Sequence, residues 1–438
     1  MNYLIGLDIG TSSVKGVLLS ISGEIKKCIT KKHNYYTMEG LKVLDADGFC
    51  QNCFNVLREL KSELETEDKI LAISSSGAGG NTMFLKDGKP ISPIYGWQNT
   101  FDAEKTERIL HSLSKEYVYE TTGWPKLSCM PLPLFAYIRE NHPEFIDESD
   151  KICMHIEYMN YRLTENWGIT MSMGTTFNLI NHKEKDYDEK ILSVLGIDKE
   201  KLPPIMGNCK VLGLVSKKAS QETGIDEGTP VVLGSFDHPS AARGAGVFNE
   251  SEILISCGTS WVVFVPFSKR EVPISKNMLT DPYMSPDGNW CGMKSLTSVS
   301  ETIDKYMNKY LGGISFEQLD VLADKSSLGA NGLLLDDDTD TSGFEKTDIA
   351  RAIMECIVLK LNDFLKIYAK DVKKIHLVGG ITKSKVWSRV ISEVTGKKVE
   401  VVNGEHAGAV GSAIMAGVGI GLFENEIEAF DLIYRKEV

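Results

Sequence analysis

The chain lacks the long apolar runs and the basic excess that mark several classes of protein. No apolar stretch approaches the roughly 20 residues that a membrane-spanning helix needs. Lysine and arginine number 48 against 60 aspartate and glutamate residues, a formal charge of −12 that argues against a nucleic-acid or membrane partner. The opening residues, MNYLIGLDIG, lack the basic segment of a secretory signal, so we expect a cytoplasmic protein.

A set of two CxxC motifs is also missing. The nine cysteines are scattered, and an odd number without pairs is typical of reduced thiols rather than of a disulfide framework. Cys50 and Cys53 form one CxxC, and because no second pair accompanies them, we interpret it as the start of a helix running to Leu64. What is present, 438 residues of which 42% are hydrophobic, is typical of a globular protein with two domains.

The rest of the chain is organised around residues 4–19, LIGLDIGTSSVKGVLL. Two apolar runs flank Gly10-Thr11-Ser12, a pattern that predicts two strands joined by a tight turn. The turn amides and hydroxyls would form a donor site for a phosphate. Asp8 fits beside a phosphate only if Mg²⁺ lies between them, and Lys15 would supply balancing positive charge. For this stretch alone, an ordinary edge hairpin is an equal alternative.

A second copy of the pattern stands in the other half of the chain. Residues 253–264, ILISCGTSWVVF, again place Gly258 and Thr259 between two apolar runs, and the offset from Gly10 to Gly258 is 248 residues. Internal repetition of this kind predicts a duplicated architecture. We therefore expect two related α/β halves, residues 1–247 and 248–438, that close on one nucleotide from both sides.

The segment 228–239, GTPVVLGSFDHP, is the second key stretch. It predicts a buried strand that ends at Gly234 and a helix that begins near Pro239, with Asp237 between them. A carboxylate in that place commonly caps a helix. It can also act as a general base that faces a ligand between the domains. Beside the paired hairpins, we favour the general base.

Three shorter stretches are candidates for ligand contacts. Trp97-Gln98-Asn99 offers an apolar face and amides for a polyhydroxylated ligand, although a lone Trp is as often part of a core. Gly379-Gly380 follows a predicted strand and precedes a helix, which allows close approach by a flat or phosphorylated ligand. Residues 171–176, MSMGTT, are either a surface turn or a ligand contact.

Together these stretches resemble the FGGY carbohydrate kinases, a branch of the actin, Hsp70 and sugar-kinase superfamily. The segments DIGTSSVKG, GWQN, GSFDHPSAARGAGV, ISCGTS, LVGGITKS and GEHAGAVGSAIMAG occur in the family's order across nearly the whole chain. The resemblance implies two duplicated ribonuclease H-like (actin-like ATPase) domains with a catalytic cleft between them. It also implies ATP and Mg²⁺ as cofactors.

The resemblance assigns a role to each matching residue. Asp8 would be the Mg²⁺-linked carboxylate and Asp237 the base that takes a proton from a sugar hydroxyl. Phosphate and adenosine contacts would come from Gly10, Thr11, Ser12, Lys15, Gly258, Thr259, Gly379, Gly380 and Ser384. The sugar contacts would be Trp97, Gln98, Asn99 and Asp237.

The prediction is an ATP-dependent kinase for a xylulose-like or ribulose-like ketose, or for a polyol, with a homodimer as one candidate assembly. Three departures leave the sugar open, and one of them is the short acidic segment 336–344, where family members usually begin a longer loop. The family usually has Asp where Asn99 follows the Trp, and residues 77–81 lack both the Arg-Glu pair of glycerol kinases and the His of xylulokinases. The alternative function is a non-catalytic ATP-binding sensor or assembly protein. A kinase for a carboxylic acid is disfavoured because no Arg cluster is present.

Overall fold

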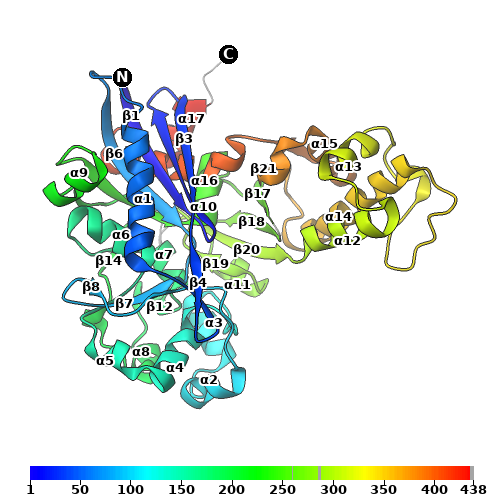
Figure 1. Ribbon diagram of the computed structural model, residues 1–438. Helices are drawn as coiled ribbons and strands as arrows, with labels where there is room; N and C mark the ends of the chain where they lie inside the picture. Colours follow the sequence, from blue (N-terminus) through cyan, green and yellow to red (C-terminus); the bar gives the residue numbers. More distant parts are fainter. Residues whose placement is uncertain (259, 285–287, 435–438) are drawn as a thin grey trace. The chain divides into compact units, whose positions relative to one another are not determined.

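The computed structural model (Figure 1) describes residues 1–258, 260–284 and 288–434 and places them in two α/β units. Unit 1 comprises residues 1–244, residues 269–290 and the chain from 408 onward; unit 2 comprises residues 245–268 and 291–407. The first boundary, 244/245, lies close to the 247/248 division that we expect from the sequence, and that division stays a prediction. Among the described helices, none is long and apolar enough to cross a membrane.

Unit 1 is built on a six-stranded sheet with the order β15-β16-β6-β1-β2-β3. β1 and β2 form the predicted antiparallel hairpin, and β6 and β16 run parallel to β1. The apolar residues of β1, among them Leu4 and Ile5, are fully buried because helices cover both faces of the sheet. The strands are β1 (Asn2–Ile9), β2 (Ser13–Ser20), β3 (Ile25–Lys32), β6 (Lys69–Gly77), β15 (Val211–Leu214) and β16 (Pro230–Phe236).

Helix α16 (Ala407–Gly419) lies against one face of this sheet, and glycine makes its close approach possible. A Cβ at Gly6 of β1 would be 1.8 Å from the carbonyl oxygen of Ala409. Likewise, a Cβ at Gly411 would be 1.8 Å from the carbonyl oxygen of Ser240 in α10 (Asp237–Ala245). These backbone contacts leave no room for a side chain, so the small residues of α16 hold β1 and α10 together.

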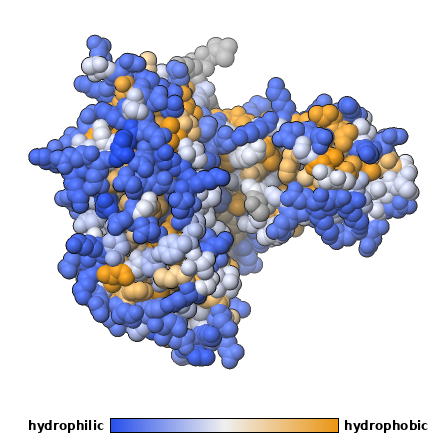
Figure 2. Space-filling model, viewed as in Figure 1, coloured by the Kyte–Doolittle hydropathy of each residue, from blue (hydrophilic) through white to orange (hydrophobic). Residues whose placement is uncertain are grey.

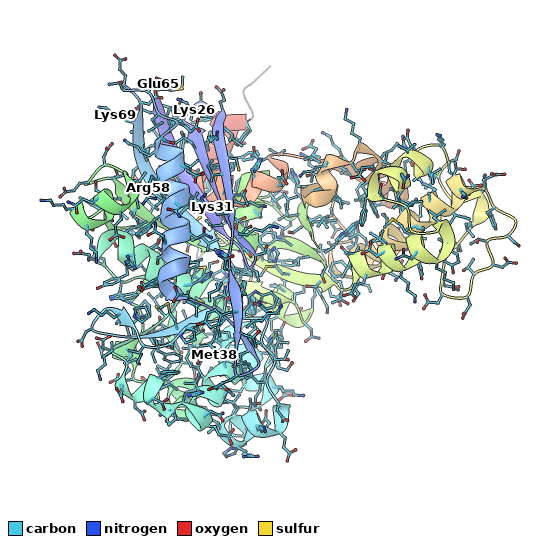
Figure 3. The ribbon with its side chains drawn as sticks, in the orientation of Figure 1. Lys26, Lys31, Met38, Arg58, Glu65 and Lys69 are labelled. Carbon is cyan, nitrogen blue, oxygen red and sulfur yellow. The ribbon has the colours of Figure 1, made fainter. Side chains whose placement is uncertain are left out.

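Helix α1 (Ala46–Lys61) covers the opposite face. Its buried side includes Phe49, Cys50 and Cys53, whereas its outer side is hydrophilic in Figure 2. Lys31 of β3, labelled in Figure 3, pairs with Glu59 of α1 at 2.6 Å. The cysteine pair therefore lies in a helix, as predicted, and burial raises the pKa of Cys50 to about 12.

A second sheet and most of the shorter helices complete unit 1. The sheet has the order β10-β7-β9-β5-β4, with β8 paired to β7. Its strands are β4 (Tyr35–Met38), β5 (Leu41–Leu44), β7 (Thr82–Lys86), β8 (Lys89–Pro90), β9 (Ile94–Tyr95) and β10 (Lys151–Met154). The helices are α2 (Ala103–Leu110), α3 (Lys115–Thr122), α4 (Pro131–Asn141), α5 (Pro143–Glu148), α6 (His155–Thr164), α7 (Met171–Thr176), α8 (Glu189–Leu195), α9 (Lys217–Thr223), α11 (Glu271–Ser275) and α17 (Glu426–Tyr434). Short strands are β11 (Ile169–Thr170), β12 (Ile180–Asn181), β13 (Asp186–Tyr187), β14 (Ile205–Met206) and β19 (Leu279–Asp281).

Unit 2 repeats the strand order of unit 1. Its strands follow the order β20-β18-β17-β21-β22, which corresponds to β3-β2-β1-β6-β16. In both, an antiparallel hairpin is followed by a parallel strand at the edge of the first hairpin strand. The elements are β17 (Glu252–Cys257), β18 (Trp261–Phe267), β20 (Trp290–Leu296), β21 (Lys374–Gly379), β22 (Lys398–Glu400), α12 (Val299–Leu311), α13 (Phe316–Ala323), α14 (Lys346–Tyr368) and α15 (Lys385–Thr395). This repetition confirms the predicted duplication.

Candidate active site

Three neighbouring parallel strands of unit 1 end at the same edge of the sheet. β1 ends at Ile9, β6 at Gly77 and β16 at Phe236, and Ile9 and Phe236 both pair with Gly77. Ligands of open α/β sheets bind outside the carboxyl ends of such strands. The residues that follow, Gly10-Thr11-Ser12 on one side and Asp237 on the other, are therefore brought to one edge.

Asp8 and Asp237 interact electrostatically at this edge. In the register of the sheet, Asp8 of β1 lies opposite Lys15 of β2 on one side and opposite Ser76 of β6 on the other. Burial, and then the nearby charge of Asp237, raise the pKa of Asp8 to about 7, while Lys15 acts to lower it. The carboxylates of Asp8 and Asp237 and the ammonium group of Lys15 thus share a small region. Such a combination of charges can bind a metal ion together with a phosphate.

Asp237 is the first residue of α10 and follows β16 directly. The strand continues to Phe236, whereas the sequence predicts its end at Gly234, and the helix begins at Asp237 rather than near Pro239. Asp237 Oδ1 accepts a hydrogen bond of 2.7 Å from the His238 amide. Its side chain is 27% exposed, so the carboxylate can be reached by a ligand.

The turn at Gly10 is held by two backbone hydrogen bonds to neighbouring segments. The His33 amide donates to the Ser12 carbonyl at 2.9 Å, and the Ala78 amide donates to the Ile9 carbonyl at 2.9 Å. A Cβ at Gly10 would meet only the Ser13 carbonyl, at an ordinary 3.5 Å. The fold itself would accept a side chain there, so packing does not require glycine at this position.

Trp97 connects the predicted sugar stretch to this turn. Its indole Nε1 donates to the Thr11 hydroxyl at 2.8 Å, and its backbone amide donates to Asn81 Oδ1 at 2.9 Å. Asn81 follows the strand end of β6, and its side-chain nitrogen lies 3.2 Å from His155 Nε2. Sequence reasoning missed Asn81, because its position next to Trp97 depends on long-range packing.

The other two residues of the stretch differ from each other. The side-chain oxygen of Gln98 is buried and, among the described residues, has no hydrogen-bond partner. Asn99 is 7% exposed; its Oδ1 accepts from the Lys42 amide at 2.8 Å, and its Nδ2 donates to the carbonyls of Lys42 and Gly96. The Gln98 oxygen is thus buried without a partner among the described residues, whereas the Asn99 amide is bonded to the backbone. Both remain predicted sugar contacts.

Unit 2 places its own predicted residues at the corresponding strand ends. Gly258 follows β17, and Gly379 ends β21, paired with Cys257. Gly379 has a φ of 95°, and a Cβ there would be 2.4 Å from the Cys257 carbonyl, so glycine is required by the fold. Gly380 has nothing within 4 Å of its Cβ position, and at Gly258 the nearest atom would be 3.7 Å away. Ser384 caps α15 by accepting from the Trp387 amide at 3.2 Å. The predicted phosphate contact Thr259 lies outside the described residues.

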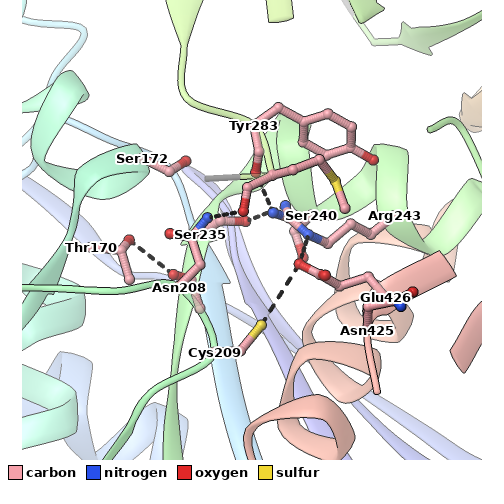
Figure 4. Close-up of polar contacts among 12 residues, drawn as sticks. Thr170, Ser172, Asn208, Cys209, Ser235, Ser240, Arg243, Tyr283, Asn425 and Glu426 are labelled. Atoms are coloured by element: carbon pink, nitrogen blue, oxygen red, sulfur yellow. Dashed lines mark hydrogen bonds and ion pairs between the residues drawn. The ribbon is translucent and has the colours of Figure 1, made fainter. Parts of the chain in front are cut away.

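A buried polar cluster surrounds Arg243 in the helix that begins at Asp237, and sequence reasoning missed it as well (Figure 4). Arg243 of α10 is fully buried and pairs with Glu426 of α17 at 3.3 Å. It also donates to the Ser235 hydroxyl at 3.2 Å and to the Tyr283 carbonyl. An arginine within a helix of small residues gives no local signal of burial, because its partners come from distant parts of the sequence.

Comparison with known proteins places this arrangement in a family. The N-terminal domain model of the FGGY family of carbohydrate kinases matches residues 3–244, and its C-terminal domain model matches residues 329–420. A xylulose kinase of Staphylococcus epidermidis is 24% identical over 98% of this chain and 90% of its own length. A gluconokinase of Bacillus subtilis is 23% identical over 99% of this chain and 90% of its own. The crystal structure of a ligand-bound xylulose kinase from Lactobacillus acidophilus superposes with a TM-score of 0.87 at 20% identity, covering 99% of this chain and 92% of that one.

The chain therefore belongs to the FGGY family of carbohydrate kinases. It is an ATP-dependent phosphotransferase that acts on a sugar, and the predicted family, duplicated fold and enzyme class are confirmed.

Proposed function

We propose that the chain transfers the γ-phosphate of ATP to a hydroxyl of a small ketose or polyol, with Asp237 as the general base. The observation that carries this proposal is the position of Asp237. It is a reachable carboxylate at the end of β16, on the sheet edge where the Gly10 turn and Asp8 also lie. A general base must stand within hydrogen-bond reach of the proton that it removes, which this edge position permits.

The phosphate contacts are proposed from the geometry of the turns. Backbone amides near Gly10, with the Thr11 hydroxyl, would bind phosphate oxygens in unit 1, and those near Gly258 would do so in unit 2. The open space beside both glycines supports this, since neither is required by packing. Lys15 would add positive charge. Gly380 and the start of α15 at Ser384 would contact the nucleoside.

Mg²⁺ fits the residues at the unit 1 edge. Carboxylates are the protein ligands that Mg²⁺ prefers, and it is commonly held by one or two of them together with phosphate oxygens and water. Asp8 would hold the ion in this way, near Asp237, with Lys15 paired to it across the hairpin. When bound, the ion would neutralise charge on the transferring phosphoryl group.

The chain's own residues would then carry out three tasks. Asp237 would accept the proton of the attacked hydroxyl as the sugar oxygen approaches phosphorus in line. Trp97 would present an apolar surface to the sugar, and the unpartnered oxygen of Gln98 would accept from a sugar hydroxyl. Turn amides would donate to the equatorial phosphate oxygens, where negative charge is concentrated in the transition state.

The test is an ADP-release assay with ATP and Mg²⁺ on D-xylulose, L-xylulose, D-ribulose, glycerol and gluconate. We expect turnover with a ketose or glycerol. Asp237→Asn should lower kcat by roughly 10²- to 10⁴-fold, because general-base catalysis contributes that much. Calorimetric affinity for ATP should be nearly unchanged.

The matched control is Asp226→Asn, which alters an exposed carboxylate of unit 1 paired with Lys61, and it should keep wild-type turnover. Wild-type kcat in Asp237→Asn would overturn the base assignment. Preference for gluconate would overturn the ketose or polyol assignment but leave the base in place. ATP binding without turnover on any acceptor would favour the non-catalytic sensor.

A further inference from the structure

The strand that delivers Asp237 carries a bulge immediately before it. In the parallel ladder with β6, Leu233 pairs with Ser75 and Phe236 pairs with Gly77, so Gly234 and Ser235 together oppose Ser76. A bulge leaves backbone groups without ladder partners and re-aims the next side chain. A Cβ at Gly234 would be 2.1 Å from the Ser75 carbonyl, so the bulge lies tightly against β6.

Two backbone groups at the bulge, the Gly234 carbonyl and the Phe236 amide, are bonded by side chains from the start of α7. Thr170, the N-cap residue of α7, donates from its hydroxyl to the Gly234 carbonyl at 3.0 Å. The Phe236 amide donates to the Ser172 hydroxyl at 3.2 Å. All six residues of α7 are buried, so the surface-turn interpretation of residues 171–176 is wrong, and the positioning role argued below takes the place of the ligand contact that the sequence left open.

Ser172 is held in this orientation by a buried carboxylate. Its Oγ lies 3.0 Å from each carboxylate oxygen of Asp281 in β19, and both residues are 0% exposed. A hydroxyl has one proton to donate. Because that proton points to Asp281, the lone pairs of Ser172 remain for the Phe236 amide.

Arg243 holds the Ser235 hydroxyl, which in turn bonds the Phe236 carbonyl. It donates to the Ser235 hydroxyl at 3.2 Å, and Ser235 in turn donates to the Phe236 carbonyl at 3.1 Å (Figure 4). The Gly234 carbonyl and both polar backbone groups of Phe236 are therefore bound by side chains. Asp237 follows directly, so its backbone position depends on these contacts.

We propose that Ser172, oriented by Asp281, is a positioning residue that holds the bulge and thereby aims the Asp237 carboxylate at the sugar hydroxyl. This inference rests on the proposed role of Asp237 as the base. It assigns to residues 170–172 a part in turnover without contact to either substrate. A small misplacement of a catalytic group lowers the rate strongly, by up to roughly a hundredfold for about 1 Å.

The first test compares Ser172→Ala with Thr175→Val in the ADP-release assay, using D-xylulose as the acceptor. Thr175 is buried in the same helix and bonds the Met171 carbonyl at 2.8 Å and His182 at 2.7 Å, so its variant also removes buried hydrogen bonds but leaves the bulge intact. We expect kcat to fall about tenfold or more in Ser172→Ala while KM for ATP stays nearly constant. Thr175→Val should keep the wild-type kcat.

Two variants of Asp281 test its role, one that keeps the hydrogen-bond acceptor and one that removes it. In Asp281→Asn the amide oxygen can still accept from Ser172, so most of kcat should be retained, whereas Asp281→Leu should behave like Ser172→Ala. Equal kcat in the Asn and Leu variants would contradict the orienting role of Asp281.

The second test is hydrogen exchange, read by mass spectrometry on peptides that cover residues 233–240. In the wild-type protein the Phe236 amide should exchange slowly, and exchange should accelerate in Ser172→Ala but not in Thr175→Val. We call the hydrogen bond from the Phe236 amide to Ser172 the clamp. Fast exchange of this amide in the wild type would overturn the clamp even if no Ser172 variant folds.

The two proposals fail in different ways. Full activity in Asp237→Asn removes the base assignment, and the exchange result then stands alone. Loss of activity in Asp237→Asn combined with wild-type kcat in a folded Ser172→Ala protein would overturn the positioning role only. If no acceptor, D-xylulose included, supports turnover, the proposed function fails while the exchange result still decides whether the clamp exists.

Discussion

The indole nitrogen of Trp97 donates a hydrogen bond of 2.8 Å to the hydroxyl of Thr11. Trp97 belongs to the stretch predicted to contact sugar, and Thr11 belongs to the turn predicted to bind phosphate. One bond therefore connects the two proposed substrate sites within unit 1. It fixes the plane of the indole ring and the rotamer of the Thr11 hydroxyl at the same time.

Trp97→Phe should impair binding of both substrates. The ring face is kept but the donor is lost, at a cost of about 1 kcal/mol, or roughly fivefold in kcat/KM. Steady-state kinetics with the accepted sugar and with ATP would measure this. Trp124→Phe is the control, because the buried Trp124 indole nitrogen has no hydrogen-bond partner in the described part of the chain. Equal losses in the two variants would contradict a special role for the Trp97 bond.

Asn99→Asp should destabilise unit 1, although the family usually has Asp at this position. The Asn99 amide donates to the carbonyls of Lys42 and Gly96, and a carboxylate would instead face those two oxygens. We expect a loss of about 2 kcal/mol in the free energy of unfolding, since buried groups are left without partners.

Urea unfolding would measure that loss, with Asn55→Asp as the control. The Asn55 side chain contributes an acceptor, to Gln51 and Arg58, and an aspartate would preserve it. An Asn99→Asp variant as stable as the wild type, with a changed sugar preference, would show that Asn99 instead contacts the sugar.

Gly408→Ala should lower activity without lowering stability. Alanine fits a helix at least as well as glycine does. However, its Cβ would lie 2.6 Å from Asp8 Oδ2, so the Asp8 side chain must move away from its position at the sheet edge. We expect a higher Mg²⁺ requirement and a lower kcat at an unchanged melting temperature.

The contrast is Gly411→Ala, whose Cβ would be 1.8 Å from the Ser240 carbonyl. Backbone cannot move as a side chain can, so this variant should melt at a lower temperature. Normal magnesium dependence in Gly408→Ala would argue against Asp8 as the ligand of the ion.

Glu157→Gln should stabilise the protein at alkaline pH. Glu157 in α6 is 2% exposed, its Oε2 has no partner among the described residues, and burial raises the pKa of its carboxyl to about 8. Between about pH 4.5 and pH 8 the folded chain retains a proton that the unfolded chain has released, so the contribution of Glu157 to stability falls as pH rises through this window.

Glutamine does not titrate in this range. The free energy of unfolding of the variant, relative to that of the wild type, should therefore rise by at least about 1 kcal/mol between pH 5 and pH 8.5, because a tenfold change in proton affinity is worth about 1.4 kcal/mol. Urea unfolding at the two pH values measures this gain. Glu148→Gln, at an exposed ion pair with Lys86, should follow the wild type. Parallel pH curves for Glu157→Gln and wild type would refute a buried titrating Glu157.

The sequence predicts the two hairpins and the helix at Cys50 because each depends on a local pattern. An apolar run, a Gly-Thr-Ser turn and a second apolar run lie next to one another in the chain, and they form the antiparallel pairs β1/β2 and β17/β18. Their repetition was enough to indicate a duplicated fold, since equal local patterns form equal local structures.

The tertiary structure decides how side chains from distant segments meet. The bulge before Asp237 cannot be predicted from local sequence, because it depends on the pairing of β16 with β6. The hydrogen bonds of the Asn99 amide cannot be predicted either, because they are made with the distant backbone of Lys42. The same holds for Ser172 and Asp281, which are 109 residues apart. By itself the sequence determined the strands, the turns and the identity of the acidic residues, since these follow from short-range patterns. Only packing placed Asp8 near Asp237 and surrounded the bulge with partners, because a buried polar group without a partner costs free energy.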